Sequence, residues 1–228
     1  MSTDPAREAA ARAAVERIEP GMTLGLGSGR AVWRAIELIG ERWPDGAPLK
    51  SAFASDRTAG VAAANGIEAI ELDGNVRLDL AIDGADEIDP GLGLIKGGGA
   101  ALLREKIVVS AAERFVVVAE EHKRVSRLGE TFRLPVEVVR FGWRDTRRRV
   151  RELLPSAEIR TDEVGAIVVT DERHHLLDAD LPPGHDLEEL AARLKGTVGV
   201  VEHGLFLGMA DEVLLGHPDG TVSVERPG

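Results

Sequence analysis

Three short loops rich in glycine or aspartate carry residue types that could bind and transform a charged, hydroxylated ligand. They are Gly25-Leu26-Gly27-Ser28-Gly29-Arg30, then Asp83-Gly84-Ala85-Asp86-Glu87, then Lys96-Gly97-Gly98-Gly99. Each loop follows an apolar run that is typical of a buried strand. Loops at the carboxyl ends of parallel strands converge on the ligand crevice of the sheet. We therefore expect the three loops to contribute to one site.

The first loop leads into a predicted helix, with Ser28, Gly29, Arg30 and Ala31 at the junction. Glycines let the backbone approach an anion, and a helix N-terminus offers N–H groups at the positive end of the helix dipole. The loop matches neither the Walker A pattern nor the full dinucleotide fingerprint. Phosphate binding and a purely structural turn both remain open here.

The second loop places Asp83 and Asp86 three residues apart, directly after an apolar strand. Such a pair often serves only an Asx turn or a helix cap. A metal site would need further oxygen ligands or a nearby histidine, and neither adjoins the pair. The chemical interpretation is that the aspartates carry protons or accept hydrogen bonds from sugar hydroxyls.

The third loop offers one cation, Lys96, and the N–H groups of three glycines to a single anionic centre. The predicted helix that follows, 100–112, has apolar residues on almost all sides, which indicates a buried helix. A carboxylate such as Glu105 in that setting tends to have a raised pKa and suits a general base. The alternative is a salt bridge from Glu105 to Arg104 or Lys106.

Composition excludes several classes of function. The chain has 228 residues, 28 Lys and Arg against 39 Asp and Glu, a formal charge of −11 and no cysteine. The acidic excess argues against a nucleic-acid partner, and the lack of cysteine removes thiol and disulfide chemistry. No apolar stretch approaches the roughly 18 residues of a membrane span, and no signal segment opens the chain. We expect a cytoplasmic protein without a membrane partner.

Two other features are expected to be structural. The basic run 144–151 has the spacing of a solvated helix face rather than of a nucleic-acid site. His174 and His175 are adjacent, so on a strand they would point to opposite faces, and we expect surface histidines rather than a metal site.

Strands and helices alternate over the first 130 residues, which predicts an α/β fold with a largely parallel sheet. Predicted strands are 22–26, 51–54, 67–72, 78–82 and 115–119, and predicted helices are 5–18, 31–43, 58–65 and 100–112. The next stretch has the strand–helix–strand–strand–helix–strand order of a ferredoxin-like unit. Its strands are 136–140, 158–161, 166–170 and 198–201, its helices 143–154 and 186–194, with 174–179 as a further candidate strand. Apolar runs at 205–207 and 213–216 could return to the first sheet.

These motifs resemble ribose-5-phosphate isomerase of the A type. The resemblance rests on Asp83-Gly84-Ala85-Asp86-Glu87-Ile88-Asp89, on the stretches 94–102 and 104–107, and on Lys123, 134–138, 204–206 and 218–220. It implies a metal-free aldose–ketose isomerase that needs no cofactor and acts on a small phosphosugar in the pentose phosphate pathway. It also implies a homodimer or homotetramer, a Rossmann-like catalytic domain of residues 1–130 and 203–228, and an inserted ferredoxin-like lobe of residues 131–202.

The resemblance also implies roles for single residues. Glu105 matches the proton-transfer base, and Asp83 and Asp86 match the carboxylates for ring opening and substrate hydroxyls. Lys96 with its glycines matches the group that stabilises the enediolate. The implied substrate-binding residues are Ser28, Gly29, Arg30, Ala31, Asp83, Gly84, Ala85, Asp86, Lys96, Gly97, Gly98, Gly99 and Lys123.

The chain departs from the family in its first loop, which usually reads Gly-Thr-Gly-Ser-Thr-Ala. Here one hydroxyl remains, at Ser28, and Arg30 and Ala31 replace the other two. We expect Arg30 to contact the phosphate; the alternative is an arginine that points to solvent or pairs with Glu37. Two rival functions are a phosphosugar-sensing domain without turnover and a transferase with Glu105 as an acyl-accepting nucleophile.

Overall fold

The computed structural model describes residues 4–184 and 186–228, which form two compact units. Unit 1 comprises the chain up to Ala85, Arg104–Lys123 and Gly208–Gly228, and unit 2 comprises Asp86–Leu103 and Arg124–Leu207. Unit 2 is thus larger than the predicted lobe 131–202, because segments on both sides of that stretch pair with each other. The described residues include no helix long and apolar enough to cross a membrane.

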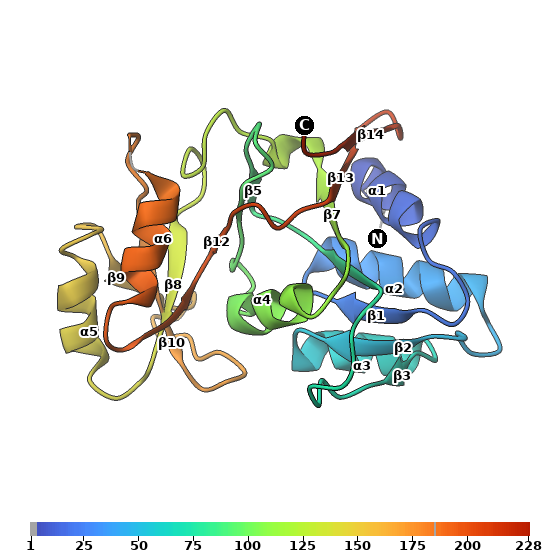
Figure 1. Cartoon of the computed structure of the whole chain (residues 1–228), viewed down its shortest axis with the longest axis horizontal. Coiled ribbons are helices and arrows are strands. Elements are labelled where there is room, and N and C mark those ends of the chain that lie inside the picture. The colour runs from blue at the N-terminus through green and yellow to red at the C-terminus, as the bar shows by residue number, and fades with distance from the viewer. Residues whose placement is uncertain (1–3, 185) are drawn as a thin grey trace. The chain divides into compact units, whose positions relative to one another are not determined.

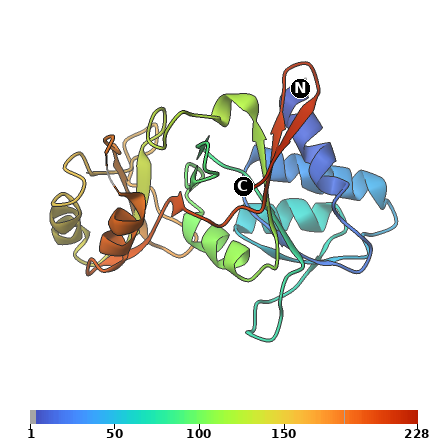
Figure 2. The same ribbon diagram turned by 45° about the horizontal axis from the view of Figure 1, so that its top comes forward.

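Unit 1 contains, in its described part, a seven-stranded sheet (Figure 1). Across the sheet the strands are β14 (Val222–Glu225), β13 (Glu212–Gly216), β7 (Phe115–Glu120), β4 (Leu80–Asp83), β1 (Thr23–Leu26), β2 (Lys50–Phe53) and β3 (Glu68–Ala69). Every neighbouring pair is parallel except β13 with β14. The predicted parallel sheet is confirmed, and so is the return of the run 213–216 to it. The run 205–207 does not return to this sheet, because Leu205 and Phe206 pair with a strand of unit 2. The hairpin of β13 and β14 is drawn in red in Figure 2.

The helices of unit 1 begin and end close to where the sequence predicts. Helix α1 is Pro5–Val15, and the Asp4 carboxylate caps it by accepting hydrogen bonds from the N–H groups of Ala6 (3.0 Å) and Arg7 (3.4 Å). Helix α2 is Arg30–Arg42, and α3 is Asp56–Ala64. Gly66, which follows the C-cap residue Asn65 of α3, has a φ of +70°, which favours glycine.

The two faces of the sheet are covered differently. Leucine, isoleucine and valine side chains of β1, β4 and β7 pack against α1, α2 and α3. The other face receives α4 (Leu102–Ser110), of which residues from Arg104 on belong to unit 1. A Cβ on Gly25 would lie 2.5 Å from Val108 Cγ1, so β1 needs glycine where α4 crosses it. The predicted burial of α4 is confirmed for Leu102, Val108 and Val109 but not for Ile107, which is 51% exposed.

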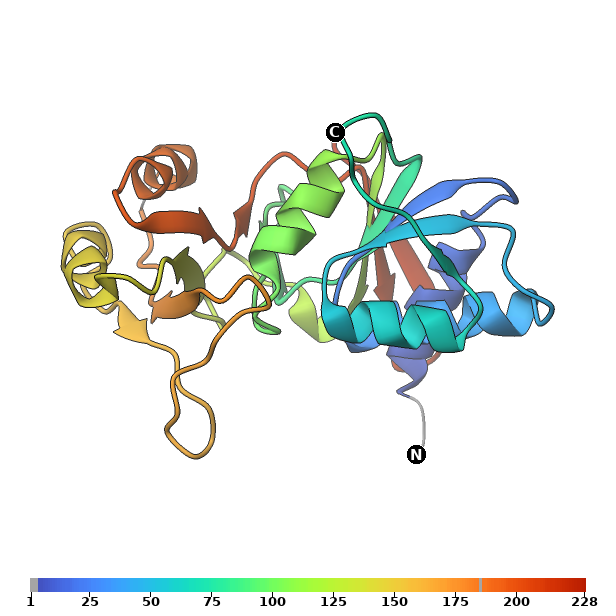
Figure 3. The same ribbon diagram turned by 90° about the horizontal axis from the view of Figure 1, so that it is seen from below.

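Unit 2 contains the predicted ferredoxin-like arrangement. Its sheet has the order β11 (Val200–His203), β8 (Leu134–Val138), β10 (His175–Ala179) and β9 (Glu158–Ile159) within the described residues, and its pairs are antiparallel. Helices α5 (Trp143–Val150) and α6 (Leu187–Lys195) pack on the same face of it (Figure 3). The arginines of the basic run on α5 pair with acidic residues at the surface, as expected of a solvated helix face.

The predicted strand 166–170 was wrong, and the candidate 174–179 is the strand instead. The carboxylate of Asp162 accepts hydrogen bonds from the N–H groups of Val164 (3.0 Å) and Ala166 (2.8 Å), which holds the chain in a turn. A single bridge, Thr161 to Ile167, is what remains of strand pairing there. Local side-chain hydrogen bonds of this kind compete with sheet formation.

Several short elements were not predicted. Strands β5 (Glu87–Ile88), β6 (Leu94–Ile95) and β12 (Leu205–Phe206) form a small antiparallel sheet in unit 2, and η1 (Glu121–Lys123) is a 3₁₀ turn in unit 1. Two-residue strands show no periodicity in the sequence, since a period of two needs several residues to be seen.

The contact of α1 with β13 generates a first prediction. A Cβ on Gly216 would lie 1.8 Å from the carbonyl oxygen of Ala6, so Gly216→Ala must displace the start of α1. We expect the free energy of unfolding to fall by about 1–3 kcal/mol, the usual cost of overpacking, as measured by urea denaturation.

Gly60→Ala is the control, because Gly60 lies inside α3 and nothing comes within 4 Å of an added Cβ. There alanine should stabilise by about 0.5–1 kcal/mol. Equal stability of the Gly216→Ala variant and the natural protein would contradict the close packing of α1 on β13.

Candidate active site

Asp83 joins the first two loops in unit 1. Strands β1 and β4 are parallel neighbours, and their carboxyl ends lie together. The Asp83 Oδ1 atom accepts hydrogen bonds from the N–H groups of Ser28 (3.1 Å) and Gly84 (2.7 Å), and the residue is 1% exposed. A Cβ on Gly27 would lie 1.9 Å from Asp83 Cγ, so this carboxylate fills the space beside a residue that has to be glycine.

The first loop presents an open helix N-terminus. Gly29 is the N-cap of α2 with a φ of +121°, and no side chain caps the helix. Arg30 is the first helical residue, exposed, and within the described residues its side chain makes no hydrogen bond or ion pair. Glu37 instead pairs with Arg34 at 2.8 Å, so the alternative in which Arg30 pairs with Glu37 was wrong. The arrangement suits an anion at the start of α2.

Sequence reasoning missed two hydroxyl groups that reach this loop from α3. The Ser28 and Ser55 hydroxyls are 3.0 Å apart, and the Thr58 hydroxyl donates to the carbonyl of Gly27 (2.9 Å). Ser55 also caps α3 by accepting from the N–H of Thr58 (3.0 Å). The capping pattern before α3 was a signal for Ser55, but nothing local in the sequence linked it to the first loop.

Lys123 lies near the end of the strand next to β4. Strand β7 pairs with β4 in parallel, and η1, which ends at Lys123, follows β7 directly. Lys123 is half-buried and makes no hydrogen bond or ion pair within the part of the chain that the structure describes. The carboxyl ends of β1, β4 and β7 therefore bring together the first loop, Asp83 and a lysine in unit 1.

Glu105 is buried, as predicted, on the first turn of α4. It is 4% exposed and lies three and four residues before Val108 and Val109, which are buried on the same side of the helix. Arg104 beside it donates to the carboxylate of Asp56 on α3 (2.8 Å). A carboxylate shielded from water in this way can take a proton from carbon without competition from solvent.

Lys96 and the glycine loop belong to unit 2. Lys96 is 2% exposed, its N–H donates to the carbonyl of Gly204 (2.9 Å), and its Nζ lies 5.4 Å from the centroid of the Phe206 ring. Gly97 has a φ of +114°, and a Cβ there would lie 2.8 Å from Leu102 Cδ2, so this position requires glycine.

The three glycine N–H groups are not equivalent. The Gly98 N–H donates to Asp86 Oδ2 at 2.7 Å, so Asp86 holds the loop from within unit 2. Gly99 is exposed, and its N–H makes no hydrogen bond within residues 4–184 and 186–228. Gly99 is therefore an exposed donor in this loop that is open to an anion.

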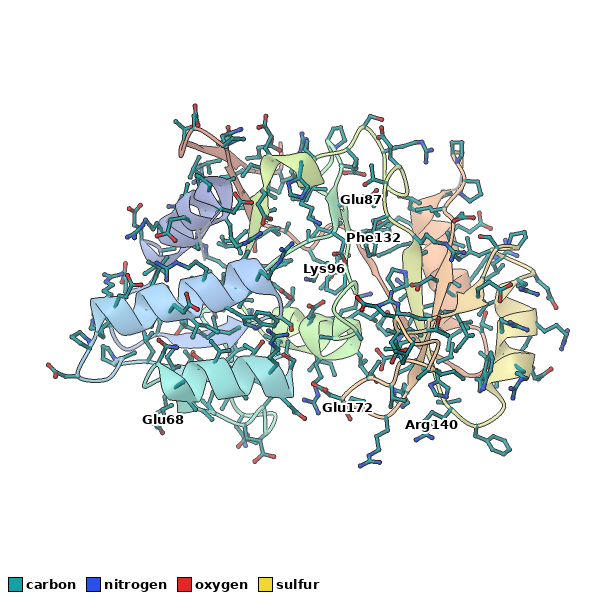
Figure 4. All side chains as sticks on the ribbon, turned by 180° about the vertical axis from the view of Figure 1, so that it is seen from behind. Glu68, Glu87, Lys96, Phe132, Arg140 and Glu172 are labelled. Atoms are coloured by element: carbon teal, nitrogen blue, oxygen red, sulfur yellow. The ribbon has the colours of Figure 1, made fainter. Side chains whose placement is uncertain are left out.

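Glu87 is a further residue that sequence reasoning did not use. It is fully buried, and its carboxylate accepts hydrogen bonds from the N–H groups of Gly129 (2.6 Å), Thr131 and Phe132 (2.7 Å) and from the Thr131 hydroxyl (2.8 Å). Figure 4 shows Glu87 beside Phe132. The Phe132 ring packs close to Gly98 and leaves little room for a side chain there, since an added Cβ would lie 3.1 Å from the Phe132 Cζ atom. Glu87 thus fixes the loop that packs on the glycines.

The two histidines are not surface residues, so that expectation was wrong. The His174 ring contacts the buried carboxylate of Glu137 (3.0 Å), and His175, 6% exposed, packs edge-on against Trp143. Burial raises the pKa of the Glu137 carboxyl, opposed in part by hydrogen bonds from His174 and Thr170. No group of three or more His, Asp or Glu residues in the described chain could hold a metal ion.

Comparison with known proteins gives a consistent result. The family model for ribose 5-phosphate isomerase A (phosphoriboisomerase A) matches residues 52–220. Ribose-5-phosphate isomerase A of Synechococcus sp. (strain JA-3-3Ab) is 46% identical over 227 residues, which cover 99% of both chains. The relative from Nitrobacter hamburgensis is 45% identical over 99% of this chain and 100% of its own.

Solved structures agree. A D-ribose-5-phosphate isomerase in complex with phospho-erythronic acid is 32% identical, with a TM-score of 0.91 over 99% of this chain and 100% of its own. The ribose 5-phosphate isomerase of Plasmodium falciparum is 33% identical, with a TM-score of 0.93 over 98% and 99% of the two chains.

The hydrogen bonds of Glu87 generate a second prediction. In Glu87→Gln one oxygen becomes an NH₂ group, which faces N–H donors it cannot accept from. We expect the unfolding free energy to fall by about 1.5–3 kcal/mol, the usual worth of a hydrogen bond to a charged group. Amide hydrogen exchange at Gly129, Thr131 and Phe132 should accelerate.

Glu130→Gln is the control, because Glu130 lies in the same loop but is exposed, and its carboxylate accepts from the N–H and hydroxyl of Ser126. Its exchange pattern at the other loop residues should match the natural protein. Unchanged protection in Glu87→Gln would show that the loop is held by other contacts.

Proposed function

The chain belongs to the ribose 5-phosphate isomerase A family, and we propose that it interconverts D-ribose 5-phosphate and D-ribulose 5-phosphate through an enediolate. The observation that carries this proposal is the 46% identity to a ribose-5-phosphate isomerase A over 99% of both chains. The motifs at 83–87 and 96–99, and the burial of Asp83, Lys96 and Glu105, support it further. The reaction belongs to the non-oxidative branch of the pentose phosphate pathway.

Glu105 is the proton-transfer base. Once the sugar ring is open, its carboxylate removes the proton from C2, and the electron pair shifts so that negative charge develops on the C1 oxygen. The proton of the C2 hydroxyl passes to the C1 oxygen, so that C2 becomes the carbonyl carbon, and the protonated Glu105 delivers its proton to C1, which completes the ketose. Substrate and product are isomers, so no redox cofactor takes part in this scheme. The burial of Glu105 supports the role, because a desolvated carboxylate is a stronger base toward carbon.

The developing negative charge needs fixed donors. Lys96 supplies a buried cation and Gly99 supplies an open N–H, and one such donor is typically worth about 10²–10³ in rate. Asp86 accepts a hydrogen bond from the Gly98 N–H and so holds the glycine loop in place. We therefore assign Asp86 two roles, fixing this loop and binding substrate hydroxyls. Asp83 keeps its role in ring opening and hydroxyl proton transfer.

The first loop and Lys123 bind the rest of the substrate. We assign the phosphate to the N-terminus of α2, with Ser28, Gly29, Arg30 and Ala31 around it. The lack of a side-chain cap at Gly29 and the unengaged Arg30 side chain, both within the described residues, support this assignment. Gly84 and Ala85, which follow Asp83, line the sugar.

We propose a cytoplasmic homodimer or homotetramer, with residues 1–130 and 203–228 as the catalytic domain and 131–202 as an inserted lobe. The lack of cysteine fits the reducing environment of the cytoplasm.

Two exposed apolar side chains support a subunit contact: Phe141 is 94% exposed and Val198 is 76% exposed. They lie near each other, because the N–H of Val139 donates to the carbonyl of Gly199 (3.0 Å).

The third prediction tests the base. Glu105→Gln should lower kcat by at least about 10³-fold with little change in phosphosugar affinity, because an amide cannot accept the C2 proton. A coupled assay for ribulose 5-phosphate and a calorimetric titration measure the two quantities. Glu113→Gln, which changes an exposed glutamate, is the control. Substantial turnover in folded Glu105→Gln would exclude Glu105 as the base, and ligand binding without turnover in the natural protein would favour the sensor function.

The fourth prediction concerns Arg30. If the guanidinium binds phosphate equally in the ground and transition states, Arg30→Ala should raise KM about 5- to 50-fold and leave kcat nearly unchanged. The salt dependence of KM should also weaken. Arg12→Ala removes an exposed charge on α1 and serves as the control. An unchanged KM in Arg30→Ala would leave Arg30 as a surface residue.

A further inference from the structure

Arg160 connects the glycine loop to the four-stranded sheet of unit 2. It follows β9 directly, and its side chain is 13% exposed. Its Nη1 donates to the carbonyl oxygens of Gly97 (2.7 Å) and Gly98 (3.3 Å). Its Nε and Nη2 donate to the two carboxylate oxygens of Asp178, with 2.8 Å for the Nε bond. One guanidinium therefore contacts the loop on one side and a carboxylate on the other.

Asp178 gives this contact a rigid base. It lies within β10, where it is paired with Pro135 of β8 and Glu158 of β9, and its side chain is 19% exposed. A two-point bond between arginine and carboxylate fixes the plane of the guanidinium as well as its position. The sheet holds Asp178, Asp178 holds the Arg160 guanidinium, and the guanidinium fixes the direction of the Gly97 and Gly98 carbonyls.

The carbonyl directions determine where the loop N–H groups point. In a trans peptide the C=O and the following N–H are antiparallel, and the described backbone contains no cis peptide. Holding the Gly97 carbonyl directs the Gly98 N–H away from Arg160, where it meets Asp86 at 2.7 Å. Holding the Gly98 carbonyl directs the Gly99 N–H in the same sense. A cation on the carbonyl also polarises the peptide and strengthens that N–H as a donor.

We propose that Arg160, held by Asp178, is a positioning residue that orients the Gly99 N–H toward the oxygen on which enediolate charge develops. This inference rests on the proposed isomerase function. Arg160 contacts neither substrate nor reacting atoms; it acts through the Gly98–Gly99 peptide. Its effect belongs to the transition state, because the donor is needed most where charge appears during reaction.

The test is Arg160→Met, which keeps much of the side-chain length and removes all five donors. We expect kcat to fall about 10- to 100-fold, less than the loss of a whole donor group, with KM changed less than about 3-fold. Affinity for phospho-erythronic acid, whose carboxylate resembles the charged enediolate, should fall in proportion to kcat/KM. Affinity for ribitol 5-phosphate, which has neither carbonyl nor carboxylate, should stay within about 2-fold.

Two further variants keep the proposal testable if Arg160→Met folds poorly. Asp178→Asn retains the side-chain shape but weakens the hold on Arg160, so kcat should fall about 3- to 10-fold with the same pattern of ligand affinities. Arg160→Lys should retain part of the activity, since lysine can reach one carbonyl but lacks the fork. Arg133→Met is the matched control: Arg133 bonds Asp180 (2.9 Å) and the carbonyl of Ser156 (2.8 Å), away from the glycine loop.

Unchanged kcat in folded Arg160→Met, or an equal loss in Arg133→Met, would overturn the proposal. Equal loss of affinity for both ligands would also overturn it, because it would indicate general damage to the site. Failure of the isomerase function itself is distinguishable, since the natural protein would then produce no ribulose 5-phosphate and Arg160 variants would have no rate to change.

Discussion

The site depends first on a carboxylate that occupies the space beside a missing side chain. Asp83 lies where β1 and β4 end, and its Oδ1 atom binds the N–H groups of Ser28 and Gly84. Only glycine at position 27 leaves room for it. Because one buried charge fixes two loops, the start of α2 and the end of β4 keep a constant spacing. The start of α2, where we propose that the phosphate binds, and the Asp83 carboxylate are thereby positioned by the same interaction.

The glycine loop of unit 2 follows the same principle with more partners. Glycine is needed there for its backbone conformation at Gly97 and for close packing at Gly98, but glycine alone leaves a loop flexible. Asp86 fixes an N–H, Arg160 fixes two carbonyls, and Glu87 fixes the neighbouring loop through Phe132. Charged groups thus supply the rigidity that the oxyanion site we propose at this loop would require.

Much of the fold and part of the site could be predicted from local patterns. The cap at Asp4, the stop at Gly66 and the ferredoxin-like order follow from residues close in sequence. Asp83 could be singled out because it pairs with Asp86 directly after an apolar strand, and Glu105 because it lies on a helix with apolar residues on almost all sides. The hydroxyls of Ser55 and Thr58 and the side chain of Arg160 contact residues that are distant in the sequence. No local sequence pattern predicts such contacts. The misassigned strand 166–170 arose because the turn made by Asp162 competes with its β-propensity.

The position of β13 has a consequence for biosynthesis. This strand lies between β7 and β14 and also packs against α1, yet it follows both α1 and β7 in the sequence and is made after them. Until β13 has left the ribosome, one edge of β7 is unpaired, and the side of α1 that packs on β13 is exposed to solvent. Unpaired edges invite association with other chains. We therefore expect the nascent protein to be most prone to aggregation after β7 has emerged from the ribosome and before β13 has.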